Sequence, residues 1–278
     1  MRRVSPASAI GSYVLMVVAA AAAMTPFVWM VLVSLHPSHG ALPDPAHLLP
    51  KHLQFANYSQ VLHMDATPFL RFLMNTLIVA VSVVCGQLLI CAPAAFAFAR
   101  LSFRGRDWLF YLFVASMMIP GQVTMIPAFL VVRSFGWLNT YWALIVPAIS
   151  SAFGIFLLRQ FFLTLPRELD EAACLDGCSP WATFWRIAAP LSSPALATLS
   201  VFAFIATWTD FFWPLLVTST TGMRTLEVGL SLFKDAFGST NWPLQMAAAV
   251  LVLLPVLLVF LAAQRFFVRG IALTGLKG

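Results

Sequence analysis

Long apolar runs, separated by short polar segments, extend along almost the whole chain. Each run has about 20 residues or more, the length at which an α-helix crosses the hydrocarbon core of a bilayer. Transmembrane β-strands need only about ten residues and alternate in polarity, so they do not fit this pattern. The pattern predicts an all-α membrane protein, a single transmembrane domain over 1–278, with six transmembrane helices at about 11–35, 73–99, 108–132, 139–158, 194–217 and 246–267.

Composition supports a membrane protein. Hydrophobic residues make up 61% of the chain and charged residues only 9%, whereas soluble domains carry charge at about 25% of positions. The first apolar run follows the basic residues of Met-Arg-Arg, and a signal peptide has the same order of a basic region and an apolar region. A signal peptide has an apolar core of about 7–15 residues, so this longer run is expected to stay as a membrane span.

Lysine and arginine predict the orientation, because cytoplasmic loops retain them. If both termini are cytoplasmic, the inner side holds eleven of the sixteen basic residues. These eleven are Arg2, Arg3, Arg100, Arg104, Arg106, Arg159, Arg167, Arg186, Arg265, Arg269 and Lys277. The outer side holds Lys51, Arg71, Arg133, Arg224 and Lys234. The net charge of +6 is therefore interpreted as a sign of topology, and no nucleic-acid partner is predicted.

Histidine and cysteine point to no definite metal site. All five histidines, His36, His39, His47, His52 and His63, fall in the first outer segment, which is rich in proline. They are compatible with a metal site or with an ordinary solvated loop, and the second interpretation is favoured. The cysteines form no C-x-x-C pair and have too few ligands nearby for structural zinc. The sequence therefore predicts no metal.

Two prolines interrupt the third predicted span. Pro120 and Pro127 lie in M-I-P-G-Q-V-T-M-I-P, and each should kink or break the helix because it removes a backbone donor and clashes with the preceding turn. At membrane depth such a break is tolerated where protein or a water-filled cavity satisfies the backbone. The prolines indicate either a functional cavity or a simple packing kink.

The fifth predicted span contains the one acidic residue found inside a span, Asp210. Burying an unpaired charge there costs at least about 2.5–3.5 kcal/mol, so Asp210 should face a polar cavity or lie near the outer end. Its neighbours are Trp208, Phe211, Phe212 and Trp213. Aromatic faces beside a carboxylate could bind a sugar, and we expect these residues in the substrate pathway. The alternative is an aromatic belt at the membrane surface.

A polar segment of about 162–192 separates the fourth and fifth spans. Its pattern predicts a helix from Glu168 to Asp176, a left-handed cap at Gly177, and a second helix capped by Ser179 and stopped by Pro190. Helices this short are marginally stable alone. A partner surface is expected to supply the missing packing.

This segment reads E-A-A-x3-G-x9-I-x-A-P, from Glu171 to Pro190. It resembles the motif E-A-A-x3-G-x9-I-x-L-P of the inner-membrane permease subunits of bacterial carbohydrate ATP-binding-cassette (ABC) importers, the maltose and glycerol-phosphate type. Only the leucine differs, replaced by Ala189. The resemblance extends to N-T-Y-W-A-L-I-V-P at 139–147 and W-T-D-F-F-W-P-L at 208–215. An ordinary cytoplasmic hairpin is the alternative for this segment.

The resemblance implies that the polar segment is a coupling loop that contacts an ATPase. The implied coupling residues are Glu171, Ala172, Ala173, Asp176, Gly177, Ile187 and Pro190. It further implies a bacterial cytoplasmic membrane, a second homologous permease, two ABC ATPase subunits that form a homodimer, and an extracytoplasmic solute-binding protein. No cofactor is expected in this chain, because ATP and Mg²⁺ would bind to the ATPase.

No catalytic motif is present, so the chain is not expected to be an enzyme. Residues 270–277 contain the glycine spacing G-x-x-x-x-G of a phosphate loop. In that loop a lysine follows the second glycine directly and a Ser or Thr follows the lysine, whereas here Leu276 precedes Lys277 and no Ser or Thr follows. We predict a permease subunit that forms, with its partner, the pathway for a carbohydrate or a glycerol-phosphate derivative. The alternative is a secondary transporter or channel driven by an ion gradient, which should show internal repeats and several intramembrane ionisable groups.

Overall fold

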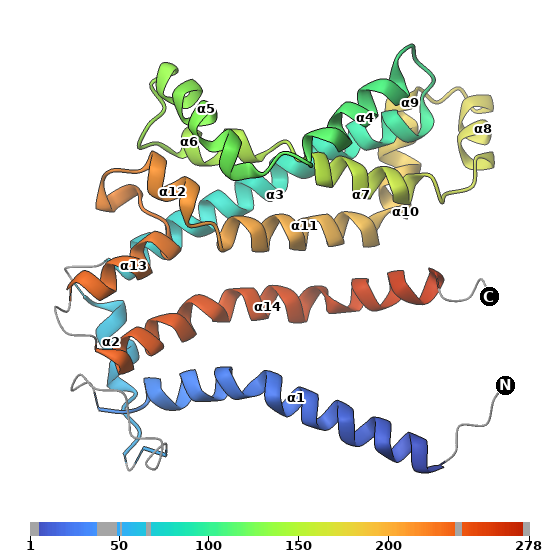
Figure 1. The fold of residues 1–278 in the computed structure, drawn as a ribbon. Helices are drawn as coiled ribbons and strands as arrows, with labels where there is room; N and C mark the ends of the chain where they lie inside the picture. Colours follow the sequence, from blue (N-terminus) through green and yellow to red (C-terminus); the bar gives the residue numbers. More distant parts are fainter. Residues whose placement is uncertain (1–5, 38–48, 51, 65–67, 237–240, 275–278) are drawn as a thin grey trace. The chain divides into compact units, whose positions relative to one another are not determined.

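The computed structural model describes residues 6–37, 49–50, 52–64, 68–236 and 241–274. These residues form helices, turns and bends and contain no strand, so the predicted all-α fold is confirmed (Figure 1). Seven residues named by number above lie outside the described ranges: Arg2, Arg3, His39, His47, Lys51, Leu276 and Lys277.

The described residues group into two compact units. The first comes from 1–69 and 230–254 and includes α1 (Pro6–Ser34), α2 (Ala56–Leu62) and the first part of α14 (Trp242–Thr274). The buried Asn57 side chain joins α2 to the end of α1, because its Nδ2 donates to the carbonyls of Ser34 at 2.7 Å and His36 at 2.8 Å.

The second unit comes from 70–229 and 255–278. Its helices, in chain order, are α3 (Phe69–Arg100), α4 (Arg106–Ser116), α5 (Gly121–Ser134), α6 (Tyr141–Ile145), α7 (Ala152–Phe162), α8 (Glu168–Leu175), α9 (Pro180–Thr183), α10 (Ala189–Leu191), α11 (Ser193–Trp208), α12 (Phe212–Val217) and the start of α13 (Leu226–Ala236). Figure 1 shows α5, α6 and α12 around one end of α3 and α8, α9 and α10 around the other.

Four described segments are long and apolar enough to cross a membrane: Gly11–Ser34, Phe69–Arg100, Tyr141–Phe162 and Trp242–Gln264. Two further pairs pass the same test but are sharply bent. The pair Arg106–Ser116 and Gly121–Ser134 bends by 101°, and the pair Pro180–Leu191 and Ser193–Trp208 bends by 81°. The number of candidate spans is four, or up to six if each bent pair is one span.

Two of the helix interruptions lie at residues that the sequence analysis singled out, Pro120 and Asp210. Pro120 stands immediately before α5 with an extended backbone, which confirms the predicted break at this proline. Helix α5 continues through Pro127, so of the predicted kink or break the break does not occur there; a proline inside a membrane helix is tolerated where local adjustment satisfies the freed backbone groups. The expected span 194–217 consists of two helices, α11 and α12, with Asp210 between them.

The core of the second unit is aromatic near the end of α3 that carries Arg100. Phe96 packs edge-on against Phe162 of α7, with ring centroids 5.8 Å apart, and against Phe184 at 5.4 Å. Gly154 lets α7 approach α11, because a Cβ there would lie 3.0 Å from the Leu199 side chain. This packing fixes the positions of the elements that form the two sites described next.

Candidate functional site

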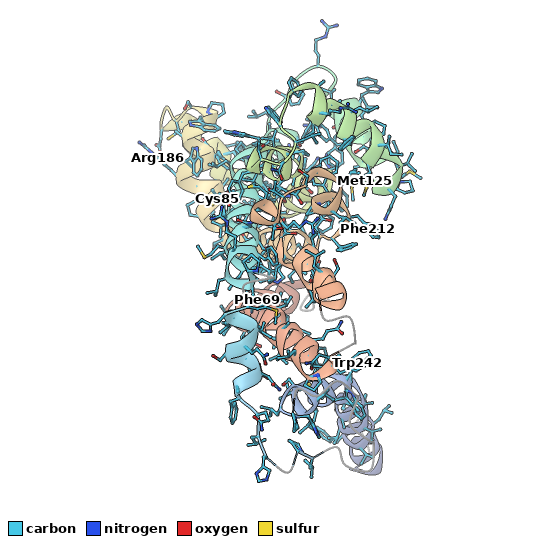
Figure 2. The ribbon with its side chains drawn as sticks, turned by 90° about the vertical axis from the view of Figure 1, so that its left-hand side faces the viewer. Phe69, Cys85, Met125, Arg186, Phe212 and Trp242 are labelled. Atoms are coloured by element: carbon cyan, nitrogen blue, oxygen red, sulfur yellow. The ribbon has the colours of Figure 1, made fainter. Side chains whose placement is uncertain are left out.

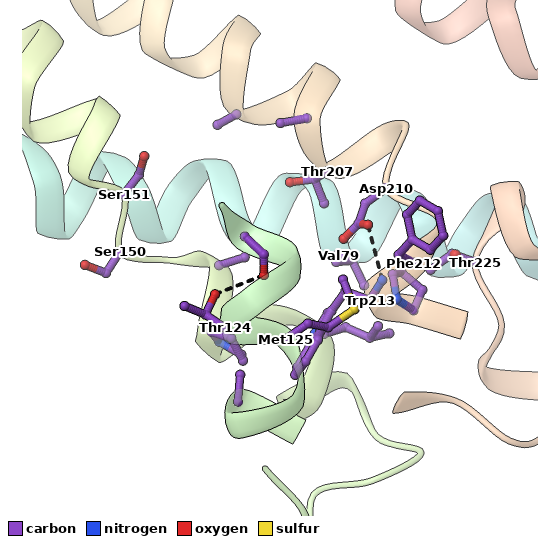
Figure 3. Close-up of a pocket in the computed structure, with 18 of the residues that line it drawn as sticks. Val79, Thr124, Met125, Ser150, Ser151, Thr207, Asp210, Phe212, Trp213 and Thr225 are labelled. Atoms are coloured by element: carbon purple, nitrogen blue, oxygen red, sulfur yellow. Dashed lines mark hydrogen bonds between the residues drawn. The ribbon is translucent and has the colours of Figure 1, made fainter. Parts of the chain in front are cut away.

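A cavity of about 540 Å³ lies among α3, α5, the α6–α7 connection and the α11–α12 junction (Figure 3). Polar side chains from all these elements line it: Thr76, Gln87, Gln122, Thr124, Ser150, Ser151, Thr207, Asp210 and Thr225. Apolar lining comes from Val79, Met125, Ala128, Leu144, Pro147, Ala203, Phe212 and Trp213, among others. The mixture of hydroxyl, amide and aromatic groups suits a solute with both hydroxyl groups and apolar faces.

Asp210 is held at the edge of this cavity by the helix that follows it. Its Oδ1 accepts a hydrogen bond from the backbone amide of Trp213 at 3.4 Å, which satisfies one of the free donors at the start of α12 (Figure 3). The indole Nε1 of Trp213 donates to the Ala143 carbonyl at 2.9 Å. The carboxylate and the indole are therefore fixed by the backbone of two different elements.

Only part of the predicted pathway cluster lines the cavity. Asp210, Phe212 and Trp213 do, and Phe212 is 62% exposed. Trp208 is 1% exposed and stacks on Phe204 in the core, with centroids 5.2 Å apart. The ring of Phe211 packs edge-on against Phe212 and is not among the lining residues. Pro120 and Pro127 are not lining residues either, although their neighbours Gly121 and Ala128 are.

The sequence interpretation missed the polar lining on the other elements. Gln87, on α3, is 9% exposed and donates from Nε2 to the Ala148 carbonyl at 2.8 Å. Ser151 caps α7, because its Oγ accepts from the Gly154 amide at 3.1 Å. A lone glutamine within an apolar span was the one available signal, because an amide at membrane depth needs a partner.

The lining of the cavity carries few ionisable groups. Among its lining residues, all of which the structure describes, Asp210 is the one ionisable side chain, and none is a lysine, arginine or histidine. An anionic solute in this cavity would thus meet a carboxylate and no compensating cation from this chain. A neutral solute would meet hydrogen-bonding groups.

The second site is the polar segment between α7 and α11. Helix α8 begins at Glu168 and ends at Leu175, with Asp176 as its cap. Glu171, Ala172, Leu175 and Asp176 are exposed, and Leu175 reaches 90%, whereas Ala173 is 3% exposed. Within the motif, Glu171, Ala172 and Asp176 therefore face outward, and Ala173 is buried.

Gly177 ends α8 in the way the sequence predicts. Its φ of +76° is left-handed, and the amide of Cys178 donates to the Ala173 carbonyl at 2.9 Å. This is the arrangement in which glycine is favoured after a helix. Ser179 then caps α9, where its Oγ accepts from the Ala182 amide at 3.3 Å and Pro180 is the first helical residue. The predicted helix, glycine hinge and helix are confirmed.

The predicted stop at Pro190 is wrong. The second helix continues from α9 through a π-helical turn, Phe184–Ala188, into α10, which contains Pro190. A wider π turn changes the hydrogen-bond pairing ahead of the proline, which has no amide hydrogen to donate. The direction changes only beyond Leu191, where the 81° bend leads into α11. Within this stretch Ile187 is half-buried, Pro190 is exposed and Ala189 is 8% exposed.

The same segment presents aromatic rings in two directions. Phe184 is 2% exposed and packs on Phe96 and on Phe162, with centroids 5.4 Å and 6.3 Å apart. Trp181 and Trp185 are 60% and 45% exposed. In Figure 2 Arg186 of this segment lies on the other side of the unit from Met125 and Phe212 near the cavity. Phe184 thus anchors the segment in the core, and the Trp181 and Trp185 rings are partly exposed.

In the part of the chain that the structure describes, no three His, Cys, Asp or Glu side chains are grouped so that they could hold a metal ion. His39 and His47 lie outside the described residues. The absence of a metal site stays a prediction.

Known proteins share both the sequence and the fold. The family model of the binding-protein-dependent transport system inner membrane component matches residues 87–273. The arabinooligosaccharide transport system permease AraQ of Halalkalibacterium halodurans is 31% identical over 258 residues, 92% of each chain. The sn-glycerol-3-phosphate transport system permease UgpE of Yersinia pestis is 36% identical over 232 residues, 82% of this chain and 83% of that one.

A solved structure agrees with these relatives. A chain of a bacterial ABC transporter involved in the import of the acidic polysaccharide alginate has a TM-score of 0.83 and 25% identity; the match covers 96% of this chain and all of that one.

A helical membrane fold, interrupted spans around a polar cavity and a hinged segment with an exposed face together define a transport permease. The chain belongs to the family of binding-protein-dependent transport system inner membrane components. It is a permease component of the ABC sugar-importer type, as its resemblance to that family predicted.

Proposed function

We propose that this chain forms one half of the translocation pathway of an ABC importer and that a second homologous permease forms the other half. A solute-binding protein delivers the solute from outside, and two ATPase subunits bind ATP and Mg²⁺ on the cytoplasmic side. Both termini are cytoplasmic in this arrangement, as the distribution of basic residues favours. The chain itself hydrolyses no ATP and needs no cofactor.

The observation that supports this proposal most strongly is the shape of the coupling segment. We define the coupling segment as residues 162–192. The buried Phe184 side chain packs the coupling segment against the rest of the second unit. Glu171, Leu175 and Trp181 of the segment are exposed. An exposed acid beside exposed apolar side chains suits a partner cleft that offers a basic group and apolar surface. Gly177 provides the turn between the two helices of the segment.

A transporter driven by an ion gradient is supported less well. Proton-coupled and ion-coupled carriers use several ionisable groups along the membrane pathway. The cavity contains one, Asp210, and this carboxylate already accepts a hydrogen bond from the Trp213 amide in the first turn of α12. The coupling segment would also have no role in such a carrier.

We further propose that the solute is a neutral carbohydrate. Two like charges about 4 Å apart repel by about 1 kcal/mol in water and about 4 kcal/mol near a protein surface. A glycerol phosphate or a uronate would meet that repulsion from Asp210, with no cation from this chain to offset it. The names of the similar proteins include both kinds of solute: arabinooligosaccharides on one side, and sn-glycerol 3-phosphate and the acidic polysaccharide alginate on the other. The charge of the cavity favours the former kind.

Asp210 offers a test of this substrate class. In cells that carry the complete importer, we expect uptake of a labelled neutral oligosaccharide, and an excess of sn-glycerol 3-phosphate should not compete. Asp210→Ala should lower the uptake by roughly tenfold or more, because a hydrogen bond to a charged group contributes about 1.5–3 kcal/mol.

Asp210→Asn is the matched variant, since the asparagine side-chain oxygen can also accept from the Trp213 amide. It removes the charge and keeps this hydrogen bond, so weaker selection against sn-glycerol 3-phosphate is expected from it. Unchanged uptake by Asp210→Ala, with a normal amount of protein in the membrane, would exclude Asp210 from the pathway. Efficient competition by sn-glycerol 3-phosphate in the wild type would reject the neutral substrate.

A further inference from the structure

Arg100 is the last residue of α3 and connects three helices at one point. Its Nη1 lies 3.0 Å from Oδ2 of Asp170, in the first turn of α8. Its Nη2 donates to two carbonyls just at the end of α7, those of Phe162 and Leu165, both at 2.6 Å. The Arg100 side chain is 6% exposed and that of Asp170 is 31% exposed. One guanidinium thus joins α3 to the start of the coupling segment, beside the end of α7, and to α8.

From this geometry we infer that Arg100 is a positioning residue that transmits movement of the coupling segment to α3 and, through α3, to the cavity. The inference rests on the proposed function, because it needs an ATPase to move the segment. Asp170 is the group through which α8 pulls or pushes on Arg100.

The chemistry of the junction favours a firm connection. The last carbonyls of a helix have no partners within the helix and carry partial negative charge, which a cation stabilises. Arginine can do this and bind a carboxylate at once, because its five donors lie in a rigid planar fork. Without Arg100, the Asp170 carboxylate would face two carbonyl oxygens in a half-buried place. Such unpaired polar groups are costly, so the junction resists separation.

A second arginine makes the connection reciprocal. Arg159, on α7, donates from Nε to the Phe98 carbonyl near the end of α3 at 3.2 Å. Its guanidinium carbon also lies 3.9 Å from the ring centre of Phe110 on α4. Each of α3 and α7 therefore sends an arginine to the carbonyl end of the other. The ends of α3 and α7 are expected to move together, with Asp170 as the attachment of α8.

Helix α3 continues without interruption from this junction to the cavity. It runs from Phe69 to Arg100, passes through Pro93, and contributes Gln87, Val79 and Thr76 to the cavity lining. Thirteen residues separate Gln87 from Arg100, which corresponds to about 20 Å along a helix. A displacement at Arg100 would therefore reach Gln87 along one continuous helix. No second connection need be assumed.

Asp170→Asn is the sharpest test, because it weakens the link to α8 and leaves Arg100 able to bind the α7 carbonyls. The complete importer, with wild-type or variant chain, would be purified and placed in lipid vesicles. Three quantities are measured: the amount of assembled complex, ATP hydrolysis with and without the solute-binding protein, and the solute taken up per ATP. Arg100→Lys is the second variant, since it keeps the charge but loses the planar fork.

For Asp170→Asn we expect normal assembly and continued basal hydrolysis. Stimulation by the binding protein and solute uptake per ATP should fall by about tenfold, within the usual range of coupling between distant sites. Arg100→Lys should show the same loss of coupling per assembled complex. Asp107→Asn is the matched control, because it breaks the exposed pair with Arg106, whose atoms lie 2.9 Å apart, and exposed pairs contribute little. It should behave like the wild type.

Two other outcomes are informative. Wild-type stimulation and wild-type uptake per ATP in both variants, whatever their yield, would overturn the inference, because a merely structural pair changes the amount of complex and not its coupling. If the wild-type chain captures no ATPase, or its ATPase does not respond to the binding protein, the proposed function fails instead. The two failures are thus distinguishable in one set of measurements.

Discussion

Replacement of Glu171 by alanine together with Gly177 by valine is expected to stop solute uptake while the chain still inserts into the membrane. Glu171 is exposed, so its loss removes a contact for the partner and leaves the membrane unit intact. Gly177 has φ +76°, and a β-branched residue there is strained by about 1–2 kcal/mol. The turn between α8 and α9 should therefore change direction. Uptake should fall to about one-hundredth of wild type, as if about 3 kcal/mol of coupling were lost.

Uptake in whole cells and co-purification of the ATPase would measure this effect. Gly136→Val is the matched control, because Gly136 also has a left-handed backbone, with φ +70°, but lies beyond α5 and outside the coupling segment. The control should keep ATPase binding. A double variant that recruits ATPase and takes up solute normally would show that the segment is an ordinary hairpin.

Phe184→Ala is expected to weaken the packing of the coupling segment against the rest of the second unit. The Phe184 ring is 2% exposed and lies between Phe96 and Phe162, at centroid distances of 5.4 Å and 6.3 Å. Truncation of a buried phenylalanine typically costs about 3–5 kcal/mol, through lost burial and the cavity left behind. Thermal unfolding of the purified complex in detergent should start at a clearly lower temperature, and uptake should fall with it.

Phe135→Ala provides the comparison for this variant. Phe135 is a phenylalanine of the same unit, but its side chain is 62% exposed. Its loss should shift the unfolding temperature far less. Equal unfolding temperatures for Phe184→Ala and wild type would contradict the role of Phe184 as the anchor.

The local signals of the sequence predicted much of the coupling segment. Gly177 and Ser179 act through their own backbone and nearest neighbours, so their positions in the sequence were enough to predict a left-handed cap and an N-cap. The prediction at Pro190 was wrong because the effect of this proline depends on the preceding turn. That turn is π-helical, and its residue types do not predict this form. The apolar runs predicted the helical class for the same local reason.

The cavity and the Arg100 junction were less predictable, because they depend on residues far apart in the chain. Arg100 meets Asp170 across 70 positions, and the count of basic residues assigned Arg100 only to the cytoplasmic side. Trp208 and Trp213 looked equivalent in the sequence, yet one stacks in the core and the other lines the cavity. Trp208 is the last residue of α11 and Trp213 lies in α12, five positions later, so only the packing of these two helices distinguishes their environments.

Transport by the purified protein in sealed vesicles tests the central claim, that the driving stroke comes from a separate ATPase and enters through the coupling segment. Vesicles with the complete importer, the binding protein and internal ATP should accumulate a neutral sugar even after the proton gradient has been dissipated. Vesicles with this chain alone should accumulate none, with or without a gradient. Uptake by the chain alone, driven by an ion gradient without ATP, would contradict the account.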